Sequence, residues 1–338
     1  MIDTKLIPQS EIKKCLTMNR AINLVEKIYT AYGNGTVIMP AKINIPMGLH
    51  EGEWPPYNAN ITSLPAFIHY ADDNEVLGMK WIWAYYNNKR DYDLPWCGAL
   101  IVLNTPKNGE PLAIMDGTYI SDMRTGAATA CAARKLANSN PKKIVSLFGA
   151  GMQGRMHAHS LSNVFDIAEL KIYDKYPEAA KAFASNMKEE LDLSITVSGS
   201  MEENCKGADV IVTCSIANEP LVDFDWLKKG CTVISVGSYI ELADNVFKAD
   251  KLYVDSWAQI CKKGKGDIGP RVENGTLTKD QLTGEIPLLL AGKVVGRESE
   301  NEIILVNMIG MGILDVGVAG DLYKNDFANC DAQTFRFV

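Results

Sequence analysis

The chain lacks the features that mark several classes of protein. Its 338 residues include only four histidines, and none of its eight cysteines forms a C-x-x-C pair, so we expect no metal site. The net charge of −7 and the absence of a basic stripe argue against a nucleic-acid partner. The cysteines are scattered, and some lie in apolar runs, as Cys214 and Cys231 do. That usage is typical of reduced, buried thiols rather than of a disulfide framework.

We also expect neither a targeting segment nor a membrane segment. The N-terminus, Met1-Ile-Asp-Thr-Lys-Leu, has no apolar signal-peptide core. The most apolar stretch, 303–320, contains Asn307, Asp315 and internal glycines, so we expect a buried, closely packed helix there and no membrane span. We therefore expect a soluble, cytoplasmic protein.

What the chain does contain is a glycine-rich turn after an apolar run. Residues 143–148 predict a strand, and Gly149, Gly151 and Gly154 follow with G-x-G-x-x-G spacing before a helical pattern. In a dinucleotide site the first glycine allows a tight turn, and the second lets the backbone approach a pyrophosphate. The third lets the helix pack on its strand. The helix N-terminus adds unpaired N–H groups and a positive dipole end.

An acidic residue supports this interpretation. The next strand-like run, 170–174, ends in Asp174, about 20 positions after the last glycine, where a carboxylate accepts hydrogen bonds from the adenosine ribose. The alternative is a glycine turn that only caps a strand. A carboxylate also repels a 2′-phosphate, so we expect NAD, with NADP less suited.

Two regions of the chain differ in pattern. The first has a helical pattern over 17–32, then short β-like runs, two of which are joined through the hairpin signal Asn108-Gly109. After an alanine-rich helix over 123–138, strands alternate with helices, which predicts a parallel sheet. We therefore expect an α/β protein with an α+β substrate-binding and dimerisation domain and a Rossmann NAD-binding domain. The first would cover residues 1–122 together with about 319–338, and the second residues 123–318. The β-like runs of the first region are 62–70, 76–86, 99–104 and 111–115; the strands predicted in the second are 143–148, 170–174, 195–197, 210–215, 232–236 and 252–254.

Three cations of the first region are candidates for chemistry. Lys42 follows Met39-Pro-Ala, and Arg124 is expected in the first turn of the alanine-rich helix, where free N–H groups would help it hold a carboxylate or phosphate. A surface salt bridge is the alternative for Arg124. Strand alternation places Lys80 opposite Met79 and Trp81. Apolar neighbours would lower its pKa toward acid–base use, whereas an edge lysine would extend into water.

Taken together, the motifs resemble those of the ornithine cyclodeaminase/μ-crystallin family over nearly the whole chain. The resemblance implies a homodimer of chains that each bind NAD(P), and hydride exchange at an amino-acid α-carbon through an imine. The matching phrases are Met39-Pro-Ala-Lys42, Ser63-Leu-Pro-Ala-Phe67, Gly78-Met-Lys80, 109–117, Met123-Arg-Thr-Gly-Ala-Ala128, 149–155, Val236-Gly-Ser238 and Gly296-Arg-Glu-Ser299.

The family's site residues carry over to this chain at matching positions. Arg124 and Lys80 match its carboxylate-binding arginine and active-site lysine, and Lys42 stands where many members have an arginine that also binds the carboxylate. The resemblance assigns the cofactor to Thr125, Gly149, Gly151, Met152, Gln153, Gly154, Asp174, Ser215 and Gly237. The expected substrate is a small amino acid, amine or imine, with Lys80 as the catalytic residue.

Two departures leave the reaction open. This chain has Trp96 and Cys97 where many members place a threonine near the cofactor, and Tyr239 where cyclodeaminases have an aspartate. Glu241 or Asp244 could replace that aspartate. An aromatic cluster including Trp81, Trp83 and Trp96 could shape a pocket or belong to ordinary core. We expect oxidative deamination or the reverse ketimine reduction. The alternatives are ornithine cyclodeamination to proline and ammonia, or an NAD-binding accessory subunit with little activity.

Overall fold

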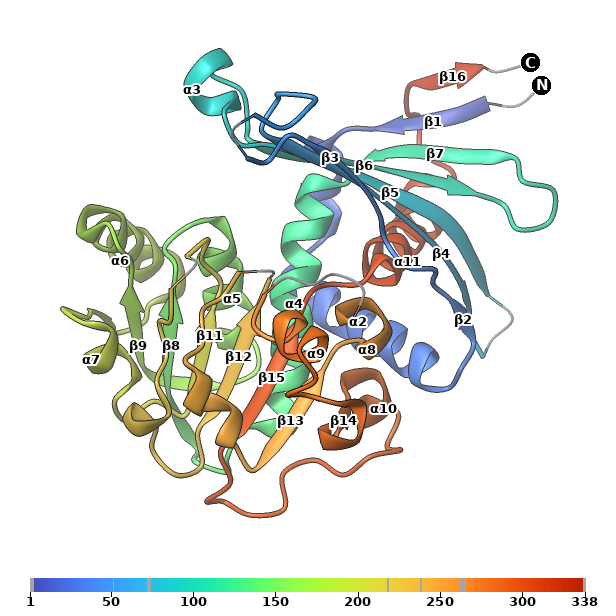
Figure 1. The fold of residues 1–338 in the computed structure, drawn as a ribbon. Helices are drawn as coiled ribbons and strands as arrows, with labels where there is room; N and C mark the ends of the chain where they lie inside the picture. The colour runs from blue at the N-terminus through green and yellow to red at the C-terminus, as the bar shows by residue number, and fades with distance from the viewer. Residues whose placement is uncertain are drawn as a thin grey trace. The chain divides into compact units, whose positions relative to one another are not determined.

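The computed structural model describes residues 3–50, 52–71, 74–217, 219–237, 239–261 and 266–336. The chain divides into two compact units (Figure 1): Met1–Arg124 with Met311–Val338, and Thr125–Gly310. Each unit has its own eight-stranded sheet, mostly antiparallel in the first and wholly parallel in the second. The predicted α/β class with a Rossmann unit is therefore confirmed.

The first unit is built on a meander. Its sheet has the order β16-β1-β7-β6-β5-β4-β2, with β3 also paired to β4. The predicted hairpin at Asn108-Gly109 joins β6 to β7, and Gly109 has a positive φ of 78°. The predicted helix over 17–32 is α2, which begins after Thr17, whose side chain accepts the Arg20 N–H. The elements are β1 (Asp3–Ile7), α1 (Gln9–Cys15), α2 (Met18–Gly33), β2 (Val37–Ile38), β3 (Ile43–Met47), β4 (Ala59–His69), β5 (Glu75–Tyr85), α3 (Asn88–Tyr92), β6 (Cys97–Asn104), β7 (Pro111–Asp116), α11 (Gly312–Leu322), a π-helix (Tyr323–Phe327) and β16 (Thr334–Arg336).

Helix α11 covers one face of this sheet, in contact with α2 and with strands β4, β5 and β6. Its glycines permit the close approach: a Cβ at Gly320 would lie 2.5 Å from Val76, and one at Gly317 would lie 2.5 Å from Ile28. These contacts place 311–318 in the first unit, whereas the sequence interpretation assigned them to the Rossmann unit.

The first five strands of the second unit follow the Rossmann order 3-2-1-4-5, and the last strand of the unit, β15, then lies between β12 and β13. The full sheet runs β10-β9-β8-β11-β12-β15-β13-β14, and the helix α4 (Thr118–Leu136) leads into it across the unit boundary. The elements are β8 (Lys142–Phe148), α5 (Met152–Ser162), β9 (Asp166–Tyr173), α6 (Pro177–Leu191), β10 (Ile195–Val197), α7 (Met201–Cys205), β11 (Val210–Thr213), β12 (Thr232–Val236), β13 (Lys251–Val254), α8 (Trp257–Ile260), α9 (Gly269–Glu273), β14 (Gly284–Glu285), α10 (Ile286–Leu290) and β15 (Ile304–Met308), with 3₁₀ turns at Phe224–Trp226, Asp244–Lys248 and Lys279–Gln281.

We expected one helix over the apolar stretch 303–320, but this stretch forms a strand followed by a helix. Its first part is β15, which pairs with both β12 and β13 inside the parallel sheet, and its second part is α11. An apolar run buried on all sides carries no period that separates strand from helix, which explains the error. Among the described residues, no helix is both long and apolar enough to cross a membrane.

Candidate functional site

A cluster of buried charges lies between the sheet and α11 in the first unit. Lys80 Nζ is 2.8 Å from Asp315 Oδ2, and Arg124 Nε donates to Asp315 Oδ1 at 3.0 Å. Ser121 Oγ accepts hydrogen bonds from both Lys80 Nζ and Arg124 Nη2, each at 3.1 Å. Lys80 is 2% exposed, Arg124 8% and Asp315 0%. The structure thus brings together two cations that the sequence analysis proposed as site residues and a carboxylate, Asp315, that it did not assign to the site.

The electrostatics of this cluster leave Lys80 ready to exchange a proton. Burial lowers the pKa of Lys80 to about 8, although the carboxylate of Asp315 acts in the opposite direction. Burial alone would raise the pKa of Asp315, but the charges of Arg124 and Lys80 outweigh it and hold that pKa below its ordinary value. With Asp315 ionised and Lys80 protonated, the three side chains carry one net positive charge, which suits one carboxylate of a ligand.

The position of Arg124 differs from the expectation. Helix α4 begins at Thr118, five residues before the expected start, so Arg124 lies in its second turn and not beside the free N–H groups of the first. A surface salt bridge is also wrong, because Arg124 is buried and its partner is Asp315. The carboxylate of Asp315 on α11 therefore balances the charge of Arg124, and Arg124 does not stand at the positive end of the α4 dipole.

The face on which Lys42 stands can be inferred from the register of β3. Lys42 comes directly before Ile43, which pairs with Ser63, and the next residue of β4, Leu64, pairs with Lys80. If the register of β3 is continued by one residue, Lys42 stands opposite Leu64, in the same row as Lys80. Residues that face one another across neighbouring strands project to the same face, so this extended register would put Lys42 on the Lys80 side.

The aromatic cluster lies elsewhere. Strand alternation puts Trp81 and Trp83 on the face of β5 opposite Lys80, and both are partly exposed. Trp96 is 48% exposed and stacks on Tyr86, with ring centroids 6.0 Å apart. These rings therefore neither form an ordinary buried core nor line the Lys80 side of their own sheet.

In the second unit the glycine turn has the geometry expected of a dinucleotide loop. Gly149 has a φ of 106°, a backbone conformation that residues with a side chain rarely adopt. A Cβ at Gly154 would overlap the Gly149 carbonyl oxygen. Around Gly151, by contrast, a Cβ would meet nothing within 4 Å. Gly151 is also the N-cap of α5, and no side chain caps that helix. Open space beside uncapped N–H groups fits a pyrophosphate.

Asp174 is held at the carboxyl end of β9, beside this turn. Its Oδ2 accepts the N–H of Ala150 at 2.8 Å, and its Oδ1 accepts the N–H of Tyr176 at 2.9 Å. Each carboxylate oxygen has a second lone pair, which ribose hydroxyls could use. The residues present therefore fit a dinucleotide with free ribose hydroxyls.

Two further predicted cofactor residues follow the central strands. Ser215 comes after β11, and its N–H and hydroxyl both donate to Glu241, which is 1% exposed. Gly237 comes after β12, with a φ of 125° and its N–H bonded to the Met308 carbonyl. Asp244, the other suggested substitute for the cyclodeaminase aspartate, instead pairs with Arg271 near the surface.

The remaining predicted cofactor residues belong to α4 and α5. Thr125 lies on α4, and Met152 and Gln153 open α5, with Met152 56% exposed. The Gln153 carbonyl accepts Nδ1–H of His157 at 2.6 Å, and the other ring nitrogen of His157 lies 3.0 Å from Thr129 Oγ1. His157 is fully buried, and burial lowers its pKa to about 4.

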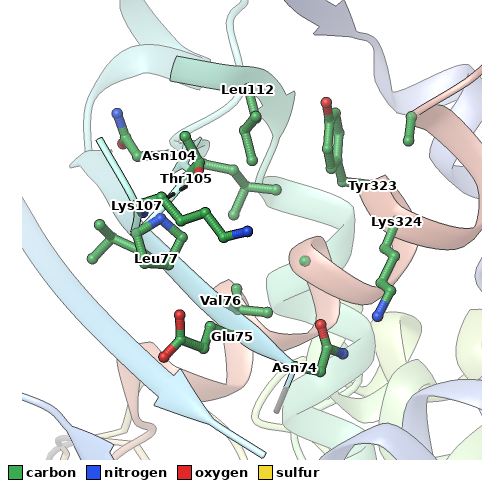
Figure 2. Close-up of a pocket in the computed structure, with 14 residues that line it drawn as sticks. Asn74, Glu75, Val76, Leu77, Asn104, Thr105, Lys107, Leu112, Tyr323 and Lys324 are labelled. Atoms are coloured by element: carbon green, nitrogen blue, oxygen red, sulfur yellow. Dashed lines mark hydrogen bonds between the residues drawn. The ribbon is translucent and has the colours of Figure 1, made fainter. Parts of the chain in front are cut away.

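The first unit also contains a cavity of about 280 Å³ (Figure 2). Its walls come from the start of β5, the β6–β7 turn and the π-helix, including Val76, Lys107 and Tyr323. None of the residues predicted for substrate or cofactor lines it. Within the described part of the chain, no group of three or more His, Cys, Asp or Glu residues is arranged to hold a metal, and all eight cysteines are free thiols.

The main residue that the sequence analysis missed is Asp315. Its signal was a single acid within an apolar stretch, which we used only to argue against a membrane span. A charge in such a stretch must have a buried partner, because an isolated buried charge is too costly. Lys80 and Arg124 were already among the three candidate cations, so a pairing of Asp315 with one of these candidates could have been proposed from the sequence.

Fold and sites define a two-unit dinucleotide-binding protein, with a Rossmann unit and a unit that presents a buried cationic cluster. The profile of the ornithine cyclodeaminase/mu-crystallin family matches residues 3–328. The chain belongs to this family, as its motifs predicted.

Individual relatives agree with this assignment. Alanine dehydrogenase from Archaeoglobus fulgidus is 32% identical over 341 residues, 99% of each chain. The structure of an archaeal alanine dehydrogenase dimer with bound NAD has a TM-score of 0.89 and 31% identity, and the match covers 100% of both chains. Thermococcus litoralis Δ1-pyrroline-2-carboxylate reductase, solved with NADH and L-proline, has a TM-score of 0.86 and 30% identity, covering 95% of this chain and 97% of that one.

Proposed function

We propose that this protein is an NAD-dependent oxidoreductase that acts on an amino acid or amine through an imine, by oxidative deamination or by the reverse ketimine reduction. The observation that carries the proposal is the Lys80–Asp315–Arg124 cluster, a buried group with one net positive charge, in which burial lowers the pKa of Lys80 to about 8. The two solved relatives named above are an alanine dehydrogenase with bound NAD and a Δ1-pyrroline-2-carboxylate reductase in complex with NADH.

In this proposal the first unit binds the substrate. Arg124, fixed by Asp315 and Ser121, holds the substrate carboxylate through its guanidinium, and Lys42 adds a second cation on the same side of the sheet. Lys42 offers a point charge where an arginine would offer a planar fork, so its contribution is weaker in orientation than in charge.

Lys80 moves the proton. During oxidation its neutral amine accepts a proton from the substrate nitrogen, and during reduction its ammonium returns one to the imine nitrogen. Asp315 keeps the amine in place and compensates the charge when Lys80 is protonated. The bound cofactor supplies or accepts the hydride at the α-carbon.

The second unit holds the cofactor in this proposal. Gly149, Gly151 and Gly154 with the start of α5 take the pyrophosphate, and Asp174 takes the adenosine ribose. Thr125, Met152, Gln153, Ser215 and Gly237 are the further cofactor residues. NAD is proposed over NADP because a 2′-phosphate would meet the carboxylate of Asp174.

We further propose a homodimer formed through the uncovered face of the first unit's sheet. On this face, opposite Lys80, the strands present apolar side chains that are at least partly exposed, and Leu100 is 41% exposed. A monomer rarely exposes so continuous an apolar surface. The apolar side chains on this face are Ile61, Phe67, Leu77, Met79, Trp81, Trp83, Leu100, Val102 and Ile114.

We propose the cytoplasm as the compartment of the protein, and the free cysteines agree with this proposal.

The direct test is turnover with a panel of amino acids and NAD, and with cyclic and linear imines and NADH. Net change in NADH with any member supports the oxidoreductase. Conversion of L-ornithine to proline and ammonia without net NADH would instead establish the cyclodeaminase. NAD binding with no turnover across the panel would favour an accessory role.

A further inference from the structure

Glu241 is held rigidly between two loops at the carboxyl ends of the Rossmann strands. Asp267 Oδ1 accepts its N–H at 2.8 Å, and its carbonyl accepts the Leu221 N–H at 2.7 Å. With its backbone fixed at both groups, the side chain reaches the loop after β11. There its Oε1 accepts the N–H of Ser215 at 2.9 Å and the hydroxyl of Ser215 at 2.5 Å. Glu241 therefore ties the Ser215 loop to the loop that follows β12 and Gly237.

Among the described residues, the groups that act most strongly on this carboxyl are Ser215, Thr213 and the buried Asp267, and none of these three is a cation. Asp267 itself accepts from Ser235 and two backbone N–H groups, with Arg271 acting on it as a distant cation. Cys214 is the other titratable neighbour, and burial together with Glu241 raises the pKa of its thiol. Burial raises the pKa of Glu241 to about 7.

A purely structural link would not need an acid here. A glutamine at this position could accept from the same Ser215 donors without the cost of burying a charge beside Asp267. A carboxylate is favoured where a neighbouring group alternates between a positively charged state and a neutral state. The oxidised nicotinamide ring is positively charged and the reduced ring is neutral. The loops after β11 and β12 stand at the edge of the sheet where ligands of such folds bind.

We propose that Glu241 is a positioning residue that fixes the Ser215 loop and discriminates the two oxidation states of the cofactor. Ionised Glu241 favours NAD⁺, and protonated Glu241 favours NADH. The inference rests on the proposed nicotinamide site. Replacement of bound NAD⁺ by NADH is then linked to uptake of a fraction of a proton from solvent at Glu241. By linkage, the ratio of NAD⁺ to NADH affinity rises as the pH rises.

The test is titration of the full-length protein with NAD⁺ and with NADH at pH 6 and pH 8, followed by tryptophan fluorescence. Calorimetry in buffers of different ionisation enthalpy counts the protons. For the wild type we expect the NAD⁺/NADH affinity ratio to increase by about fivefold over this range. In Glu241→Gln the ratio becomes independent of pH, while the affinities stay within about threefold of the wild type because the acceptor for Ser215 is kept.

Two further variants separate this role from a structural one. Ser215→Ala removes one donor to the ionised form, so the pH at which the ratio changes moves upward. Glu202→Gln, an acid exposed on α7, is the matched control and leaves the wild-type pH dependence intact. A ratio that changes with pH equally in the wild type and in Glu241→Gln overturns the inference. Failure of the wild type to bind either nucleotide overturns the proposed function instead.

Discussion

Lys80 and Asp315 form a buried ion pair of 2.8 Å between the middle of β5 and helix α11, far apart in sequence. Asp315 also bonds Arg124, so one carboxylate orients both cations proposed to act on the substrate. The pair places a strand of the first 124 residues and a helix of the last 28 in one chemical unit.

Replacing Asp315 by Asn should destabilise the protein, because both buried cations lose their counter-charge. The change leaves Lys80 and Arg124 buried without their counter-charge, and we expect a loss of roughly 3–5 kcal/mol in the free energy of unfolding. Urea denaturation measures this. The double variant Lys80→Met/Asp315→Asn should recover part of the loss, because only one buried cation then lacks a partner. Equal stability of wild type and Asp315→Asn would show that the pair is not formed.

Replacing Lys80 by Met should abolish turnover and leave NAD binding within about twofold, because Lys80 belongs to the unit that does not carry the glycine loop. In the wild type, oxidation needs the neutral amine, so kcat/KM should rise with pH up to about 8 and then level. Reduction needs the ammonium and should fall above the same pH. Stopped-flow rates in both directions check this. Identical pH profiles in the two directions would contradict the role of Lys80.

Gly151 and Gly154 should respond differently to alanine. A methyl group at Gly154 would overlap the Gly149 carbonyl, so Gly154→Ala should lower the melting temperature and weaken NAD binding together. A methyl group at Gly151 meets nothing within the protein. Gly151→Ala should therefore keep the melting temperature and weaken NAD binding by about tenfold or more. Unchanged affinity in Gly151→Ala would place the pyrophosphate elsewhere.

Asp174 should determine the choice of dinucleotide. Asp174→Ser removes the carboxylate that accepts ribose hydroxyls, so we expect the affinity for NAD to fall by roughly tenfold and that for NADP to rise. Comparative titration with both nucleotides measures the change. Asp192→Asn, at the exposed end of α6 with a φ of 52°, is a suitable control, because asparagine tolerates that conformation. A variant that still rejects NADP would mean that other groups exclude the 2′-phosphate.

The proposed dimer can be disrupted at Leu100. Leu100→Glu places a charge within the apolar face opposite Lys80 and should shift the protein to monomer, as measured by light scattering. The control is Ile216→Glu, which charges an apolar side chain that is 72% exposed in the other unit. A monomeric wild type, or a dimeric Leu100→Glu, would count against this interface.

The Rossmann unit and its loop could be predicted because their signals are local. The strand before Gly149, the glycine spacing and the acid after the next strand all lie within about 30 residues, and each has a fixed conformational role. The helix α2 and the hairpin at Gly109 were predicted for the same reason, from periodicity and from a turn residue.

What could not be predicted depended on packing between distant segments. The strand β15 and the helix α11 come from one apolar run, and only their neighbours decide which part forms a strand. The start of α4 was missed because its first turn, from Thr118, lacks the alanine-rich pattern. The sequence analysis consequently placed Arg124 in the first turn of the helix, whereas it lies in the second turn.

The discontinuity of the first unit has a consequence for how the protein is made. Synthesis proceeds from the N-terminus, so β5 with Lys80 leaves the ribosome well before Asp315, and the entire Rossmann unit emerges in between. Until α11 arrives, Lys80 lacks the carboxylate of Asp315, and the sheet surface that α11 covers in the folded protein is exposed. We therefore expect nascent chains that end before residue 311 to hold a folded nucleotide unit next to an incomplete partner, a natural substrate for chaperones.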